Sequence, residues 1–369
     1  MDASMLALPP SGTATYVRSL SAALRAIDPD VALTTLSPDW DGPAGAGPLG
    51  RIVGNRRVRR FAWDAWGSGW AARAVAPELL HIPQFAAPMW APCPVVVTIH
   101  DVIPLVLDDY RGSPAMRLYA AFMARMARGA RLILTPSHAA AGDIERVLGI
   151  PLDQIRVTPE AADPSYRPGE DPAEIRAVRR RYGIGERYVF NVGGLDVRKN
   201  LATLIEAFAQ VVSRSEGPVD LVIAGAAHSE NTIVFPPLAP VVARLGLTSR
   251  VRLIGRVSEA DKLALYRGAA VYTTPSLYEG FGLTALEAMA CGVPTIAARR
   301  TSLPEVVGDG GLLVEPTVDD LAAAMVSVLG DPSLARGLGE RGLARAGMFS
   351  WEETARLTRA AYDEAVRGR

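Results

Sequence analysis

The stretch that decides the fold runs from residue 275 to residue 294 and reads PSLYEGFGLTALEAMACGVP. It predicts a strand that ends near Ser276, a glycine-containing turn, and a helix from about Leu283 that Gly292 stops. The helix N-terminus would present free backbone amides and the positive end of the helix dipole, which together favour an anion such as phosphate. The residues expected to supply these amides are Phe281, Gly282, Leu283 and Thr284.

Two glutamates frame this helix start. Glu279 precedes the helix, and Glu287 follows eight residues later, about two turns deeper. We therefore expect Glu279 beside the anion site, and Glu287 where its carboxylate can accept two hydroxyl hydrogen bonds, as a ribose diol offers. The plain alternative is that both are solvated glutamates, because a glycine-rich turn before a helix is weak evidence when taken alone.

Short β-branched runs alternate with helical spacing on both sides of this stretch. Such alternation predicts a parallel sheet with helices on both faces. The expected strands are Tyr188–Val192, Leu221–Ala224, Val251–Ile254, Val271–Thr274, Thr295–Ala298 and Leu312–Val314. The expected helices are Leu201–Val212, with Asn200 as its N-cap, Asp261–Arg267 and Leu283–Ala290.

The first half of the chain repeats this α/β style. The expected strands are Val31–Leu36, Leu79–Ile82, Val95–Ile99 and Leu132–Thr135, and the expected helices are Thr15–Ala26, Met116–Arg128 and Ala139–Leu148. Because Pro159–Pro168 has no periodicity, we predict an N-terminal domain over 1–165, a C-terminal domain over 166–348, and a final segment, 349–369, that contains an amphipathic helix. Two such domains would leave a cleft facing the carboxyl ends of both sheets, where such sheets bind ligands.

Composition excludes several classes of protein. The 369 residues carry 39 Lys and Arg and 39 Asp and Glu, so the net charge of zero argues against a general nucleic-acid binder. Two cysteines cannot form a disulfide framework. No signal peptide is visible, and the most apolar run, Ala86–Ile99, is too short to span a membrane. We therefore expect a cytoplasmic protein.

A second candidate segment, Asn191–Asn200 (NVGGLDVRKN), also lies between a strand and a helix. Arg198 could bind a diphosphate there through two parallel guanidinium hydrogen bonds, and Lys199 through its compact ammonium charge. A solvated basic pair is the alternative. Against it, the chain has only two lysines, Lys199 and Lys262, beside 37 arginines, which favours a specific ammonium role for Lys199.

In the first half, His100 follows the apolar run Val95–Ile99, at the edge of the sheet where ligands bind. Gly12 precedes a helix and could face a phosphate or sugar, although a plain helix cap by Ser11 or Thr13 explains the pattern equally well. The other histidines, His81, His138 and His228, are interpreted as structural. No His, Cys and Asp cluster has metal-ligand spacing, so we expect no metal.

Three further features favour ordinary structural interpretations. Ser302 and Glu305 have capping-box spacing, and Asp39-Trp-Asp41 is interpreted as a turn rather than a metal-binding pair. Five arginines in Arg51–Arg60 precede four aromatic residues, Phe61, Trp63, Trp66 and Trp70. The favoured interpretation is a helix that buries its tryptophans; the alternative is peripheral contact with anionic lipid at the inner face of the plasma membrane.

Together these residues resemble glycosyltransferase family 4, which consists of retaining enzymes of the GT-B fold. The likeness rests on the block from Glu279 to Pro294 and is supported by Thr98–Asp101, Arg198–Asn200, Ile254–Ser258 and the closing Phe349-Ser-Trp helix. It implies two Rossmann-like α/β/α domains with a cleft between them, and a C-terminal helix that crosses back to the N-terminal domain.

The resemblance also implies roles. Glu287 would bind the ribose, Val257 would lie at the base, and Glu279 with the amides of Phe281 to Thr284 would contact the donor sugar and distal phosphate. Arg198 and Lys199 would neutralise the diphosphate, and His100 and Gly12 would act from the first domain. Two departures stand out: many relatives carry arginine where this chain has Gly194, and the first strand is absent or cut to a stub before Asp2.

The expected activity is transfer of a hexose, with mannose from a guanosine diphosphate sugar favoured over a uridine donor. The acceptor would be a saccharide or lipid-linked saccharide in surface polysaccharide assembly, with no cofactor and no metal. Two alternatives from other classes stay open: a sugar-nucleotide epimerase, and a non-catalytic sugar-nucleotide binder of the same fold.

Overall fold

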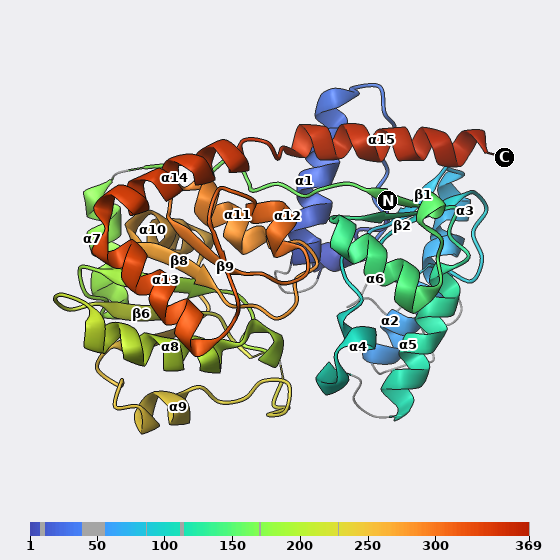
Figure 1. Cartoon of the computed structure of the whole chain (residues 1–369). Coiled ribbons are helices and arrows are strands. Elements are labelled where there is room, and N and C mark those ends of the chain that lie inside the picture. The colour runs from blue at the N-terminus through green and yellow to red at the C-terminus, as the bar shows by residue number, and fades with distance from the viewer. Residues whose placement is uncertain are drawn as a thin grey trace. The chain divides into compact units, whose positions relative to one another are not determined.

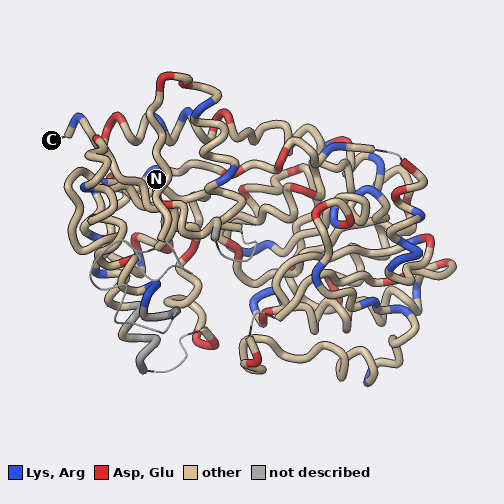
Figure 2. The backbone as a smooth tube through the Cα atoms, turned by 180° about the vertical axis from the view of Figure 1, so that it is seen from behind, with Lys and Arg blue, Asp and Glu red and all other residues tan. Residues whose placement is uncertain are grey.

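The computed structural model describes residues 1–7, 12–38, 56–85, 87–110, 114–169, 171–227 and 229–368. These residues form two compact units. The first unit comprises Met1–Glu160 together with Ser350–Arg369, and the second comprises Ala161–Phe349. Acidic and basic residues are interspersed along the backbone of both units, in keeping with the balanced net charge (Figure 2).

The second unit contains a parallel sheet in the order β10-β9-β8-β5-β6-β7. Its strands are β5 (Tyr188–Val192), β6 (Asp220–Ala224), β7 (Val251–Gly255), β8 (Val271–Thr274), β9 (Thr295–Ala298) and β10 (Leu312–Val314). All six expected strands are confirmed to within one residue at either end. Because β5 and β8 pair directly although they are not consecutive in the chain, the turns that follow them leave the same edge side by side.

Helices cover both faces of this sheet (Figure 1). Tyr188 and Phe190 pack with helices α7, α10, α11 and α12, whereas Val189, one residue between them, packs with α8, α9 and α13. Such alternation along a strand is what a sheet buried on both faces requires. The helices are α7 (Pro172–Tyr182), α8 (Leu201–Arg214), α9 (Ala239–Arg244), α10 (Glu259–Gly268), α11 (Leu283–Ala290), α12 (Leu303–Val307), α13 (Val318–Gly330) and α14 (Pro332–Ala346).

The first unit has a parallel sheet in the order β1-β2-β3-β4. Its strands are β1 (Leu80–Ile82), β2 (Val95–Thr98), β3 (Leu132–Thr135) and β4 (Ile155–Val157). The prediction of a strand over Val31–Leu36 is wrong: Leu36 forms an isolated parallel bridge with Asp2, and Val31–Thr35 are not strand. The reason lies in the backbone pairing. Met1–Ala3 lies between Leu36 and His81, and its backbone bonds to Leu36 and His81 without extending into a ladder along Val31–Thr35.

Helices also cover both faces of the first sheet. They are α1 (Gly12–Ile27), α2 (Arg56–Ala62), α3 (Ser68–Val75), α4 (Ile103–Val106), α5 (Pro114–Ala127), α6 (His138–Leu148) and α15 (Trp351–Arg367). Helix α15 lies against α1 and packs Ala361 and Ala365 on Val96, Leu132 and Leu134 of the sheet (Figure 1). The C-terminal helix is therefore part of the first unit, and the predicted fold class is confirmed.

The helical segment 56–75 corrects one interpretation. A π-helical stretch, Trp63–Gly67, joins α2 to α3. Trp63 is buried, as expected, but Trp66 and Trp70 are 37% and 57% exposed, so two of the three tryptophans lie outside the core. No helix among the described residues is long and apolar enough to cross a membrane.

Candidate active site

The turns after β5 and β8 meet through their charged side chains. Lys199 Nζ lies 2.5 Å from Glu279 Oε1, and Arg198 Nη1 lies 2.9 Å from Glu279 Oε2. Each carboxylate oxygen therefore faces a different cation. The structure thus brings together three of the four predicted catalytic residues, although Glu279 lies 80 positions after Lys199 in the sequence.

This cluster is buried, and its charges support one another. Lys199 and Glu279 are 8% and 9% exposed. Burial alone would raise the pKa of Glu279, but the adjacent Lys199 and Arg198 outweigh burial and lower this pKa to about 2. Arg198 also pairs through Nε with Asp196 at 2.9 Å. Two cations and two carboxylates thus balance before any ligand binds.

Backbone contacts fix the turn that carries Glu279. Its amide donates to Thr301 Oγ1 at 3.0 Å, and Ser302 Oγ donates to the carbonyls of Glu279 and Phe281 at 2.9 and 2.8 Å. The capping-box interpretation of Ser302 is therefore wrong: its hydroxyl does not cap α12, because it is needed by two carbonyls of the neighbouring turn. The sequence could have indicated this role by position, because Thr301 and Ser302 follow the end of β9 and therefore lie at the same sheet edge as the Glu279 turn.

Gly282 makes the turn into α11 possible. Its φ of 102° is a backbone conformation that favours glycine, and an added Cβ would lie 2.8 Å from Leu303 Cδ2. The amides of Ala285 and Leu286 bond to the Gly282 carbonyl, which places Phe281, Gly282, Leu283 and Thr284 at the helix N-terminus, as predicted. An N-terminus of this kind favours an anion.

Glu287 is buried in α11 and faces α10. Its Oε2 accepts a hydrogen bond from the Tyr266 hydroxyl at 2.9 Å, and its Oε1 lies 3.3 Å from Lys262 Nζ. Burial raises the pKa of Glu287, while Lys262 and Tyr266 oppose that rise. Val257 is partly buried just before α10, whose N-terminus is capped by the Ser258 hydroxyl. The sequence marks Lys262 as one of two lysines but does not indicate its partner.

In the first unit, His100 follows β2 and bonds to an unpredicted residue. Its Nδ1 lies 2.9 Å from Glu160 Oε1, and its ring meets the edge of Tyr16 with 4.7 Å between centroids. Burial lowers the pKa of His100, but Glu160 outweighs burial and the net direction is upward. Glu160 could have been found by position, because it follows β4 at the edge where His100 follows β2. Gly12 begins α1, the helix that carries Tyr16.

Several interpretations concern residues elsewhere. His81 is buried and bonds to Thr98 and Tyr362, which fits a structural role. Asn200 is the N-cap residue of α8, but its side chain bonds to Pro316 and Thr203 instead of capping the helix amides. Ser11, Asp39, Asp41 and His228 lie outside the described residues. Among the residues that the structure describes, no three His, Cys, Asp or Glu side chains gather as a metal site requires.

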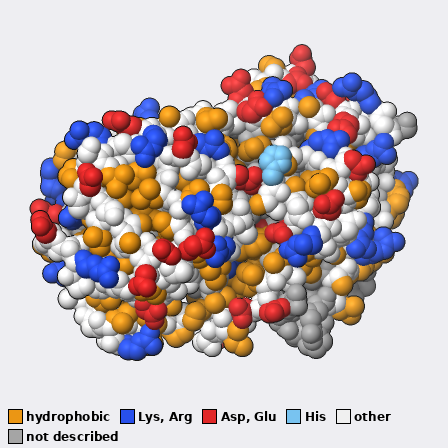
Figure 3. All heavy atoms as spheres, in the orientation of Figure 1, with side chains coloured by type: hydrophobic (Ala, Val, Ile, Leu, Met, Phe, Trp, Pro, Cys, Tyr) orange, Lys and Arg blue, Asp and Glu red, His pale blue; other side chains and the backbone are white. Residues whose placement is uncertain are grey.

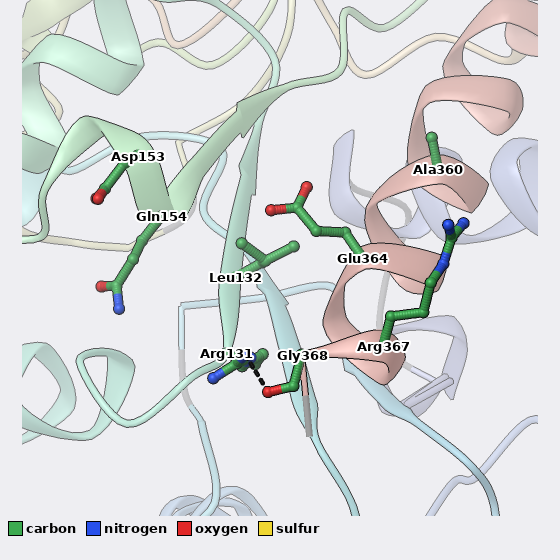
Figure 4. Close-up of a pocket in the computed structure, with 8 residues that line it drawn as sticks. All are labelled: Arg131, Leu132, Asp153, Gln154, Ala360, Glu364, Arg367 and Gly368. Carbon is green, nitrogen blue, oxygen red and sulfur yellow. Dashed lines mark hydrogen bonds between the residues drawn. The ribbon is translucent and has the colours of Figure 1, made fainter.

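A pocket of about 660 Å³ lies in the first unit, and Figure 4 shows the residues that line it. It is lined by Arg131 and Leu132 at the amino end of β3, and by Glu364 and Arg367 of α15. His100 instead follows the carboxyl end of β2. Because parallel strands place their amino and carboxyl ends at opposite edges, this pocket and His100 belong to opposite edges of the sheet.

Comparison with known proteins identifies the family. The description "Glycosyl transferases group 1" matches residues 174–345, and "Glycosyltransferase Family 4" matches residues 10–166. The chain is 33% identical over 295 residues to O-antigen chain mannosyltransferase B of Escherichia coli, covering 79% of this chain and 76% of that protein. The chain belongs to glycosyltransferase family 4.

Other family 4 relatives extend this comparison. Serotype-specific mannosyltransferase WbdA of Escherichia coli is 30% identical over 273 residues, which is 72% of this chain and 33% of that protein, so the chain spans about a third of that relative. The structure of sucrose-phosphate synthase from Thermosynechococcus elongatus aligns with a TM-score of 0.71 at 24% identity, covering 98% of this chain and 95% of that one, which shows the GT-B fold. This family 4 chain is therefore a retaining glycosyltransferase with mannosyltransferases among its relatives.

Proposed function

We propose that this glycosyltransferase moves mannose from a guanosine diphosphate sugar to a saccharide or lipid-linked saccharide in the assembly of a surface polysaccharide. The similarity to O-antigen chain mannosyltransferase B supports the choice of sugar and pathway. We infer a guanosine donor from two sequence segments, the turn Arg198-Lys199-Asn200 and the segment His100-Asp101-Val102-Ile103-Pro104. A uridine donor is the second candidate.

The observation that carries this proposal is the triad of Arg198, Lys199 and Glu279. Breaking the anomeric bond places negative charge on the leaving diphosphate, so groups fixed around it lower the barrier. We propose that Arg198 and Lys199 supply that stabilisation together with the amides from Phe281 to Thr284. Glu279 holds both cations in place and contacts the donor sugar. Arg198 also takes over the phosphate contact that many relatives make with an arginine at the position of Gly194.

The remaining site residues receive roles in the same proposal. Glu287 binds the ribose hydroxyls, since a buried carboxylate can accept from both members of a diol. Val257 borders the base. His100 and Gly12 take part from the first unit in handling the transferred sugar. Retention proceeds by front-face attack, in which the leaving phosphate accepts the proton of the acceptor hydroxyl.

A thermal-shift screen tests the donor first. Wild-type protein is heated with GDP, UDP and ADP, because a ligand that binds the folded state raises the melting temperature. We expect GDP to give the largest rise. A larger rise with UDP selects the second candidate, and no rise with any of the three contradicts the proposed function.

Product analysis separates the alternatives from other classes. With GDP-mannose alone, an epimerase would form an isomer of the donor without any acceptor. A non-catalytic binder would show a thermal shift but neither transfer nor slow hydrolysis. A transferase shows hydrolysis with donor alone and transfer when an acceptor is added.

We also propose that the first unit contacts anionic lipid at the inner face of the membrane. Trp66, Trp70 and Trp90 are exposed, and Arg73 is exposed and stacks on Trp70, whereas Asp64, the acidic residue of segment 56–75, is buried. Exposed tryptophan beside basic residues suits the interface of an anionic bilayer.

Liposome sedimentation checks this contact. We expect retention on anionic liposomes at low salt, with loss when Arg56, Arg57, Arg59 and Arg60 are changed to Ser. Trp70→Ser should weaken retention without changing the net charge. Absence of retention in low salt would exclude the contact and would leave the proposed transfer unaffected.

A further inference from the structure

The two lysines of this chain pair with the two glutamates of the 275–294 stretch. Lys199 lies 2.5 Å from Glu279, and Lys262 lies 3.3 Å from Glu287. All other basic side chains in the sequence, histidine aside, are arginine. The first pair belongs to the proposed diphosphate site, whereas Lys262 lies in α10 and has no part in that site.

The surroundings of Lys262 show a built arrangement. Its Nζ lies over the Tyr166 ring, 5.2 Å from the centroid, and 3.0 Å from Glu259 Oε2. The side chain of Glu259 is 80% exposed, whereas those of Lys262 and Glu287 are 16% and 7% exposed. Lys262 and Tyr266 are four residues apart on α10 and therefore share a face, from which they reach the two oxygens of Glu287.

This geometry leaves acceptor positions on Glu287 for a diol. A carboxylate has about four acceptor positions, two on each oxygen. Tyr266 occupies one position on Oε2, and Lys262 faces Oε1, so each oxygen retains a second position. A compact ammonium at 3.3 Å suits this purpose better than the planar arginine fork, which binds both oxygens of a carboxylate at once.

We propose that Lys262 is a positioning residue that keeps Glu287 ionised and oriented to accept two hydrogen bonds from the ribose of the donor nucleotide. This inference rests on the proposed function, in which Glu287 binds the ribose. Lys262 acts through Glu287 and makes no contact of its own with the reacting atoms.

The groups around Glu287 support this role. Besides Lys262 and Glu259, they are Tyr166, Tyr266, Tyr272 and Cys291. Burial raises the pKa of each tyrosine above its usual value and that of Cys291 to about 12, so these four groups are neutral at pH 7. Lys262 is the cation among these groups. It lowers the pKa of Glu287, whereas burial and the charge of Glu259 raise that pKa and so favour the protonated carboxyl.

The test measures GDP affinity by calorimetry between pH 5.5 and 9 for wild type, Lys262→Met, Lys262→Arg and Glu287→Gln, with UDP in parallel. At pH 7 we expect Lys262→Met to weaken binding about tenfold or more, as loss of a charged hydrogen-bond partner does. The affinity of Lys262→Met for GDP should recover as the pH rises, because Glu287 then ionises. In a plot of GDP affinity against pH, the low-pH fall in affinity (the acid limb) therefore moves to higher pH. A purely structural defect would instead lower affinity equally at every pH.

Controls isolate the ribose contact. At pH 7, removing the 2′-hydroxyl from the nucleotide (2′-deoxy-GDP) should cost affinity in wild type and much less in Lys262→Met. Lys262→Arg should show an intermediate cost, because its charge keeps Glu287 ionised but its fork competes with the diol for both oxygens. Inorganic pyrophosphate should bind wild type and Lys262→Met alike. Glu259→Gln removes the exposed carboxylate and should move the acid limb slightly to lower pH, opposite to Lys262→Met. If Lys262→Met does not fold, Lys262→Gln replaces it.

The outcomes distinguish the two proposals. If wild type binds neither GDP nor UDP, the proposed function fails. If wild type binds and Glu287→Gln weakens binding, but Lys262→Met keeps the wild-type affinity and pH profile, the role of Lys262 is overturned and the proposed function stands. The role of Lys262 would also be overturned if the low-pH fall in GDP affinity occurred at the wild-type pH in both Lys262→Met and Glu259→Gln.

Discussion

Lys199 and Glu279 join the turns after β5 and β8 through an ion pair of 2.5 Å in which both side chains are buried. Because β5 and β8 are neighbours in the sheet, the pair fixes two turns against each other at the edge where α/β sheets bind ligands. Arg198 reaches the other oxygen of the same carboxylate. The carboxylate thus holds two cations in fixed positions, which is the preorganisation that stabilises a leaving diphosphate.

Replacing Lys199 with alanine should lower kcat about tenfold or more, because one preorganised positive donor is lost. Arg198 still pairs with Glu279, so we expect the protein to stay folded. Steady-state kinetics with GDP-mannose, checked by circular dichroism, measure this effect. Lys199→Arg is the matched control and should retain part of the activity. A folded, fully active Lys199→Ala protein would contradict the proposed role of the ammonium.

Replacing Gly282 with alanine should destabilise the second unit by about 1–3 kcal/mol and abolish nucleotide binding. The substitution adds backbone strain and brings a Cβ to 2.8 Å from Leu303. Gly217 provides the matched control, since its φ is 80° but a Cβ there meets nothing within 4 Å. Gly217→Ala should therefore cost only the backbone strain and leave GDP binding intact. Equal effects of the two variants on binding would disprove a special role for the turn at Gly282.

The stability of the first unit should fall as the pH rises from about 4 to 7, because of Asp64. Burial raises the pKa of Asp64 to about 7, even though Arg60 and Gln84 favour its ionised form. A carboxyl whose pKa is higher in the folded state binds its proton more tightly there, so stability is greatest below the unfolded value and is lost towards the folded value. Melting curves of wild type between pH 4 and 8 should show this loss.

Asp64→Asn should reduce that pH dependence, since asparagine can still accept the hydrogen bond from Gln84 and carries no charge. Burial also raises the pKa of the neighbouring Asp2, which should leave a smaller dependence of the same sign. At pH 8 the variant should be more stable than wild type by at least about 1.4 kcal/mol, the value of one pKa unit. Parallel pH profiles for the two proteins would show that Asp64 is not the source.

Chelation should leave sugar transfer unchanged. In the proposed mechanism the diphosphate charge is balanced by Arg198, Lys199 and helix amides, which need no metal ion. Transfer is measured with and without EDTA, and after adding Mg²⁺ or Mn²⁺. Complete loss with EDTA, restored by a metal, would direct attention to Asp39 and Asp41.

Much of the second unit could be predicted because its signals are local. Hydrophobic periodicity marked all six strands, and the Gly-Phe-Gly turn marked the start of α11 at Leu283. The first unit was less predictable. Val31–Leu36 has the composition of a strand, but a strand forms only where a partner supplies hydrogen bonds, and here the partner is Met1–Ala3. Trp66 and Trp70 were likewise expected in the core, where packing admits only Trp63.

The sequence by itself determined the alternating elements and the family-specific block from Glu279 to Glu287. It also marked the two lysines among 37 arginines as residues whose role needs an explanation. These features depend on neighbours within a few residues or on composition. Only the tertiary structure decided which groups meet: Lys199 with Glu279, Lys262 with Glu287, His100 with Glu160, and Ser302 with the Glu279 turn. Such pairs join residues 23 to 80 positions apart. Strand order brings the turns of three pairs to the edge of their own sheet, whereas Lys262 and Glu287 meet between helices α10 and α11. Figure 3 shows acidic and basic side chains interspersed over the face in view, whereas the sequence gives only their equal numbers.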